Sequence, residues 1–104
     1  MKTIKARVTQ NDINTGSQID PLACPISQAL QRKGLDCYVG DDSTDIEYPG
    51  GSKSFEHDEF VANWIALFDI DRNKVEPFDM VLDVNSEQLV VNHIKDLYEA
   101  NPSL

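Results

Sequence analysis

The stretch Thr9–Gly34, TQNDINTGSQIDPLACPISQALQRKG, decides how this chain folds. Its Cys24-Pro25 pair predicts the start of a helix, because proline suits the first helical position, where its missing N–H would be unpaired anyway. Arg32 favours the negative end of that helix, and Gly34 provides its stop. Thr9 is predicted to cap a single helical turn over residues 10–14, with Gly16 as a left-handed stop.

Upstream of this stretch, residues 3–9 alternate between apolar and polar side chains and predict a half-buried strand. Downstream, residues 36–40 and 45–48 are two short strand candidates that flank four polar residues, Asp41-Asp42-Ser43-Thr44. We predict that they form an antiparallel hairpin. Pro49-Gly50-Gly51 then breaks the chain.

The second half of the chain predicts two more helices and a strand. Apolar residues at helical spacing predict a core helix from about Glu56 to Phe68, and alternation over residues 78–84 predicts a strand. Asn85 or Ser86 is expected to cap a last helix that ends at Asn101-Pro102. The predicted order is β-α-β-β-α-β-α in one α+β domain over residues 1–104, mainly an antiparallel sheet with helices on one face.

The charge narrows the classes of partner. With 18 acidic and 9 basic residues the formal net charge is −9, which disfavours direct binding to nucleic acid or anionic membranes, because phosphate contacts need Lys and Arg. No apolar run is long enough to cross a membrane. The N-terminus lacks the apolar core of a signal peptide. We therefore expect a cytoplasmic location and, if a partner exists, a basic protein.

Acidic residues crowd the predicted hairpin, where they would form a negative surface if they share one face. A surface of this kind speeds encounter with a basic partner. The acidic residues that we assign to this candidate binding face are Asp36, Asp41, Asp42, Asp45 and Glu47. Charge spread over the whole surface for solubility is the alternative.

Cys24 is the one candidate for a reactive thiol, because a helix N-terminus lowers the pKa of a thiol. No base lies near it in sequence, so a buried capping role is the alternative. The spacing of Cys24 and Cys37 matches no common zinc pattern, and the calcium-like start Asp69-Ile70-Asp71-Arg72-Asn73 lacks the later ligands. Residues 56–59, Glu-His-Asp-Glu, point in different directions on a helix. We predict no catalytic site, metal or cofactor.

Four polar side chains of the Thr9–Gly34 stretch are the best candidates if this joint also binds a ligand: Gln10, Asp12, Asp20 and Ser27.

Taken together, TQNDINTG, DPLACPISQAL, FVANWIALFD and VEPFDMVLDV resemble a group of small uncharacterised proteins encoded by bacteriophages and bacteria. In that group a Thr-Gln-x-x-Ile-x-x-Gly opening leads to a Cys-Pro-[Ile/Val]-x-x-Ala-Leu helix, and a Phe-Asp…Val-x-Pro-Phe segment closes the core. The resemblance covers residues 7–84, so residues 85–104 look like a C-terminal helical addition. It implies the fold class and an origin in a mobile element.

These observations support three functional hypotheses. The first is a non-enzymatic accessory protein that binds a basic host protein. The second is a nucleic-acid mimic that inhibits a DNA- or RNA-binding host protein through carboxylates spaced like phosphates. The third is a redox or enzymatic role through Cys24. The chain is expected to be a monomer, or a homodimer that pairs through the predicted C-terminal helix.

Overall fold

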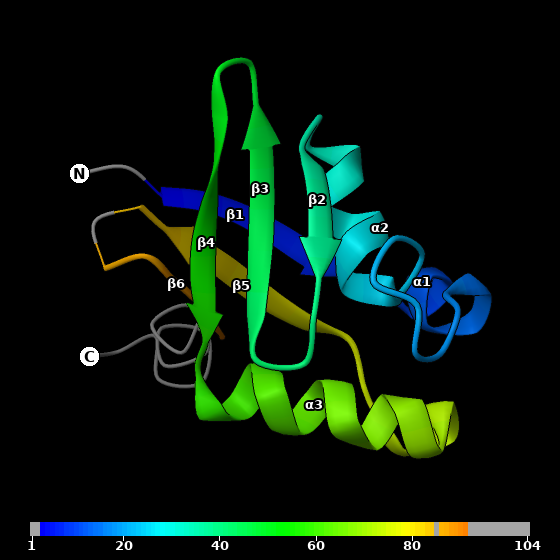
Figure 1. The fold of residues 1–104 in the computed structure, drawn as a ribbon. Coiled ribbons are helices and arrows are strands. Elements are labelled where there is room, and N and C mark those ends of the chain that lie inside the picture. Colours follow the sequence, from blue (N-terminus) through cyan, green and yellow to red (C-terminus); the bar gives the residue numbers. More distant parts are fainter. Residues whose placement is uncertain (1–2, 85, 92–104) are drawn as a thin grey trace, which may run out of the picture.

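A computed structural model describes residues 3–84 and 86–91 as one α+β unit (Figure 1). Its six-stranded sheet has the order β1-β5-β6-β4-β3-β2. Every neighbouring pair is antiparallel except β4 and β6, which run parallel. The strands are β1 (Thr3–Val8), β2 (Asp36–Val39), β3 (Ser43–Tyr48), β4 (Gly51–His57), β5 (Phe78–Asp83) and β6 (Gln88–Val91).

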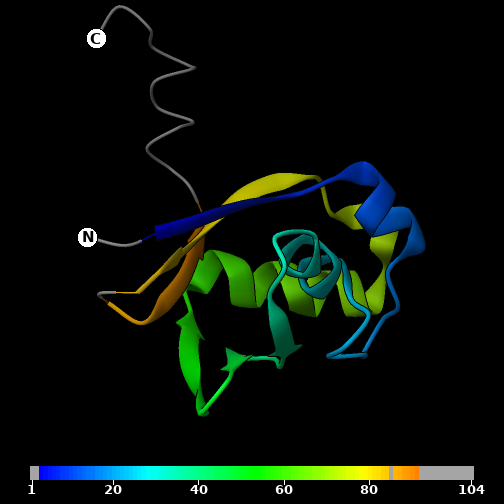
Figure 2. The same ribbon diagram turned by 90° about the horizontal axis from the view of Figure 1, so that it is seen from above.

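Three α-helices and a short 3-10 helix complete the described residues: α1 (Gln10–Thr15), α2 (Pro25–Arg32), α3 (Glu59–Ile70) and η1 (Arg72–Lys74). The sheet curves around α2 and α3, which both lie on its concave face (Figure 2). The core fills this concave side, and its largest fully buried side chains include Phe68, Ile13, Ile26, Leu30 and Met80. The predicted class, with helices on one face of a mainly antiparallel sheet, is confirmed.

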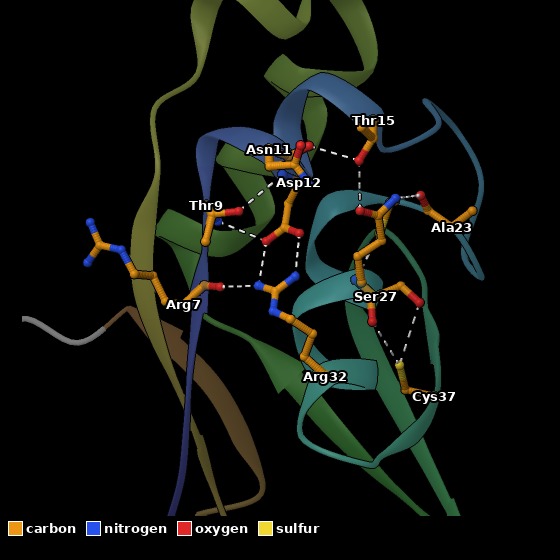
Figure 3. A network of polar contacts seen from close by, with 11 residues as sticks. Arg7, Thr9, Asn11, Asp12, Thr15, Ala23, Ser27, Arg32 and Cys37 are labelled. Atoms are coloured by element: carbon orange, nitrogen blue, oxygen red, sulfur yellow. Dashed lines mark hydrogen bonds and ion pairs between the residues drawn. The ribbon is translucent and has the colours of Figure 1, made fainter.

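The joint between β1 and α2 is held by one buried carboxylate (Figure 3). Thr9 and Asp12 form a capping box, in which each side chain accepts a hydrogen bond from the other residue's backbone N–H. Asp12 also accepts two bonds from the guanidinium of Arg32, one of them at 2.7 Å. A further bond from Arg32 reaches the backbone carbonyl of Arg7 at 2.8 Å, so the guanidinium ties the strand to both helices.

The same contacts set the charge state of Asp12. Burial alone would raise the pKa of this carboxyl, but the hydrogen bonds from Arg32 and Thr9 outweigh it and lower the pKa below its usual range. Asp12 is therefore ionised in the folded protein at neutral pH.

The predicted boundaries hold in the first half of the chain and need one correction. Cys24 caps α2, Pro25 is its first residue, and Gly34 has a left-handed φ of 80°, as predicted. Gly16 is not left-handed, because its φ is −68°. Glycine is needed there for space, since a Cβ would lie 2.7 Å from both the carbonyl oxygen of Asp12 and Cδ of Pro25.

Two predicted helix starts are wrong. Residues 51–57 form β4 as the antiparallel partner of β3, so α3 begins at Glu59 rather than near Glu56. Gln88–Val91 forms β6 rather than the first turns of a C-terminal helix, because it pairs with both β5 and β4. The remainder of that predicted helix, with the homodimer contact assigned to it, lies outside the described residues.

Candidate functional site

The convex side of β2, β3 and β4 carries a group of acidic side chains. Strands send alternate side chains to opposite faces, and on these strands Cys37, Val39, Ile46 and Phe55 are directed into the core. The residues between them therefore face outward. We call this surface the hairpin face, defined by Asp36, Tyr38, Asp45, Glu47 and Glu56.

The register of the hairpin face places like charges together. Asp36 lies directly opposite Glu47 on the neighbouring strand, an arrangement that is destabilising for two carboxylates. Tyr38 is opposite Asp45, and Ser52 and Ser54 of β4 are opposite Glu47 and Asp45. The hairpin face as defined, with the three serines beside it on β3 and β4, includes no basic side chain.

The structure brings together three of the five predicted acidic residues, Asp36, Asp45 and Glu47, on this face. Asp41 and Asp42 instead lie in the turn between β2 and β3, with exposed side chains. Their backbone carbonyls are occupied by His57: its backbone N–H donates to Asp42 at 2.8 Å, and its Nδ1 contacts the carbonyl of Asp41 at 3.1 Å. The turn is thus fixed from inside while its carboxylates face solvent.

His57 completes this arrangement through a buried hydroxyl. A carbonyl only accepts, so Nδ1 of His57 carries the proton, and Nε2 accepts from Oγ1 of the fully buried Thr44 at 2.7 Å. Burial lowers the pKa of His57, although the bond to the carbonyl of Asp41 and the carboxylates of Asp42, Asp58 and Asp41 act in the opposite direction. The imidazole is therefore neutral at pH 7.

A cleft of about 340 Å³ opens where this turn meets α3 and the loop before α2. Three acidic residues, Asp20, Asp41 and Asp69, contribute to its lining together with Tyr38 and Ile65. Two of the carboxylates each accept a hydrogen bond from a backbone N–H. Leu22 donates to Oδ1 of Asp20 and Ile19 donates to Oδ1 of Asp69, both at 3.0 Å. The residues that line the cleft include no Lys, Arg or His.

Ile19, on the rim of this cleft, has an unusual backbone. Its φ of 56° is in the left-handed region, which a β-branched residue rarely adopts and which costs on the order of 1–3 kcal/mol. Its side chain is 80% exposed, so packing of that side chain does not compensate for the cost. The bond to Asp69 and a bond from the side chain of Gln18 to the carbonyl of Phe68, at 2.8 Å, fix the loop against α3.

Cys24 has the environment of a structural thiol. Its Sγ accepts a bond from the backbone N–H of Ser27, at 3.4 Å, and its exposed fraction is 8%. Burial raises the pKa of Cys24 to about 11, against the lowering effect of the backbone N–H groups of Ser27 and Ile26. Burial also raises the pKa of Cys37. The redox hypothesis therefore gains no support from this site, since little thiolate exists at neutral pH.

The other candidates of the joint are mostly structural. Asp12 is buried in its ion pair and Ser27 is fully buried, while Gln10 bonds Asn14 within α1 at 3.0 Å. Asp20 alone among them reaches the cleft.

Neither of the two acidic sequence clusters forms a metal site in the described part of the chain. Glu56 and His57 end β4, Asp58 caps α3 by accepting from Val61, and Glu59 begins the helix. In the calcium-like stretch, Asp71 caps η1 by accepting from Asn73 at 3.0 Å. Within residues 3–84 and 86–91, no three His, Cys, Asp or Glu residues are grouped as metal ligands would be.

Three residues of this region escape prediction from the sequence. Glu56 belongs to β4, a strand that the sequence does not predict. Its position on the hairpin face is therefore known only from the pairing of β4 with β3. The outward position of Tyr38 follows from the predicted strand over residues 36–40, but the sequence does not mark it as a residue of a site. Ile19 gives no signal at all, since apolar residues of its type rarely adopt its backbone conformation.

No helix among the described residues is both long and apolar enough to cross a membrane. Comparison of the chain with protein-family models, with curated proteins and with solved structures gives no match.

Proposed function

We propose that this protein is a non-enzymatic binding factor that recognises a basic surface of a partner protein through the hairpin face. The observation that carries the proposal is the pair Asp36–Glu47, two carboxylates directly opposite each other. Such a pair lowers the stability of the isolated protein. A Lys or Arg of a partner placed between them would remove the repulsion, so the pair favours the bound state.

The side chains around this pair suit a protein partner. Tyr38 is half exposed on the hairpin face, and tyrosine is enriched at protein interfaces because it offers a large apolar ring with a polar end. Three serines, Ser43, Ser52 and Ser54, lie beside the acidic residues in the register of β3 and β4 and offer hydrogen bonds. The resemblance to proteins of bacteriophages and bacteria supports an accessory role directed at a host protein.

The proposal is tested by NMR titration of the labelled protein with an oligolysine peptide at low salt. We expect amide shifts centred on residues 36–38, 45–47 and 54–56, which decrease as salt is added. The double variant Asp36→Asn/Glu47→Gln should weaken binding about 10-fold or more, the range expected for two charge contacts. The matched control Asp71→Asn/Glu76→Gln removes the same charge elsewhere and should retain the binding. Shifts spread evenly over all acidic residues would contradict the proposal.

Nucleic-acid mimicry is a second candidate, favoured by the spacing of Asp45 and Glu47. Asp45 and Glu47 are two residues apart on one strand, so their backbone positions are about 6.6–6.8 Å apart along β3 and their side chains leave the same face. A competition experiment with an identified partner separates the two candidates. If the hairpin face imitates a nucleic acid, added nucleic acid should displace this protein from the partner. If the partner's basic surface does not bind nucleic acid, no displacement is expected.

A further inference from the structure

The helix α3 carries apolar side chains beyond the face that it buries against the sheet. Phe60, Leu67 and Ile70 are 40%, 38% and 79% exposed. Leu67 lies about two helical turns after Phe60, and Ile70 lies about one turn further on, so the three side chains leave one side of the helix. We call these three residues the α3 stripe. A helix that is apolar on more than one side is normally covered on more than one side.

The stripe adjoins the sheet where β6 ends. The ring of Phe60 lies against the ring of Phe78, the first residue of β5, with the centroids 5.2 Å apart. β6 is antiparallel to β5, and its last residue, Val91, is opposite Met80, two positions along β5 from Phe78. The chain therefore leaves β6 at the end of β5 that contacts the stripe.

The other edge of β6 gives the same position. β6 runs parallel to β4, which leads directly into α3 (Figure 1). The carbonyl of Leu89 in β6 accepts a hydrogen bond from the backbone N–H of Asp58, the N-cap residue of α3, at 3.0 Å. The chain that follows β6 thus starts beside the first turn of α3.

Residues 92–104, NHIKDLYEANPSL, follow β6 and lie outside the described residues. Ile94, Leu97 and Tyr98 recur in this segment at helical spacing and predict one apolar side. As a helix the segment would be about 20 Å long, and the α3 stripe extends over about 15 Å of its own helix. The segment is therefore long enough to follow the stripe from its starting point.

We propose that the α3 stripe docks the C-terminal segment of the same chain, in which Ile94, Leu97 and Tyr98 cover Leu67 and Ile70. The tether favours this occupant, because a segment that starts beside its site has an effective concentration there on the order of millimolar. A second copy would instead approach against the same net charge of −9. The inference goes beyond the proposed function, since it involves no partner protein.

NMR spectroscopy of the full chain tests the docking. We expect nuclear Overhauser contacts between the methyl groups of Leu67 or Ile70 and the side chains of Leu97 or Tyr98. In a mixture of labelled and unlabelled chains, spectra filtered for contacts between two chains should lack these signals. Contacts that persist in the filtered spectra would show that a second copy is the occupant. Absence of the contacts from both samples would show that the segment does not cover the stripe. Either result overturns the inference.

Two variants of the segment separate its apolar side from its polar side. Leu97→Ser/Tyr98→Ser removes apolar residues and should shift the amide signals of residues 60–70, while the signals of the hairpin face stay in place. The matched control, Asp96→Ser/Glu99→Ser, changes the other side of the segment at helical spacing and should leave residues 60–70 unshifted. Equal shifts of residues 60–70 in both variants would overturn the inference, because the apolar residues would then play no particular part.

Discussion

The backbone N–H of Ile19 donates a hydrogen bond to Oδ1 of Asp69 at 3.0 Å and so fastens the loop before α2 to the last turn of α3. This bond holds Ile19 at a φ of 56°, with its side chain in solvent. The fold therefore keeps an unfavourable conformation at the rim of the acidic cleft, where backbone strain is typical of binding regions.

Replacement of Ile19 by asparagine should stabilise the protein. The left-handed conformation costs isoleucine about 1–2 kcal/mol more than a residue that tolerates it, and the exposed side chain contributes little packing. We expect the free energy of unfolding of Ile19→Asn to rise by about 1 kcal/mol. Urea denaturation followed by the fluorescence of Trp64 measures it. Leu22→Asn, exposed in the same loop, should give no comparable gain, and a loss of stability in Ile19→Asn would contradict the strain assignment.

Asp12→Ala should be strongly destabilising. The substitution removes the ion pair with Arg32 and one half of the capping box with Thr9, so we expect a loss of about 2–4 kcal/mol. Arg7→Gln, which breaks the exposed pair between Arg7 and Asp79, should cost less than about 1 kcal/mol. Because the pKa of Asp12 is lowered from an unfolded value of about 3.9, this stabilisation is fully present at neutral pH. It is lost only as the pH falls below about 4.

His57 should make the protein less stable in mild acid. Its pKa is lower in the folded than in the unfolded state, so between these two values the unfolded chain binds more protons, and stability falls as the pH falls below about 6.5. Denaturation of the wild type at pH 7.5 and 5.5 measures the loss. In His57→Gln the free energy of unfolding should fall less between pH 7.5 and 5.5 than it does in the wild type, because the contribution of His57 is removed. An NMR titration that places the pKa of His57 above 6.5 would contradict the expectation.

Cys24 should react slowly with alkylating reagents in the folded protein. With a pKa of about 11, only about one thiol in a thousand is ionised at pH 8. Mass spectrometry after iodoacetamide treatment should show modification of Cys24 at least ~100-fold slower in buffer than in denaturant. Rapid modification of the native protein with an apparent pKa well below 8.5 would instead revive the redox hypothesis.

Elements with local signals could be predicted from the sequence. The Cys24-Pro25 start and Gly34 stop of α2, the alternation of β1 and β5, and the β2–β3 hairpin depend on neighbouring residues alone. β4 could not be predicted, because Gly51, Ser52 and Lys53 have no preference for strands and Glu56–Glu59 is typical of a first helical turn. Residues 51–56 form a strand because each of them pairs with a residue of β3.

β6 shows the same competition. Leu89 and Val90 share a helical spacing with later residues, but consecutive valines at 90 and 91 also favour a strand, and the pairing with β5 and β4 prevails. For the candidate site, the period of a strand is enough to place Asp45 and Glu47 on one face, whereas the position of Asp36 beside them depends on the register of β2 and β3. The cleft and Ile19 could not be predicted, because they depend on contacts between segments about 50 residues apart.

The parallel contact of β4 with β6 joins two antiparallel halves of the sheet, β1-β5-β6 and β2-β3-β4. Among the described residues it consists of two residue pairs, Glu56–Gln88 and His57–Leu89. The β2-β3-β4 half is built of short hairpins, whereas the other half pairs residues 3–8 with residues 78–83, and the junction pairs residues 56–57 with residues 88–89. We therefore expect β2-β3-β4 to assemble before the longer-range pairings of β1 with β5 and of β4 with β6, and native-state hydrogen exchange at the short β4–β6 junction to be the fastest among the interior strands. A basic partner that spans the hairpin face would contact one half alone, and would act on the other only through this junction and the core that both halves share.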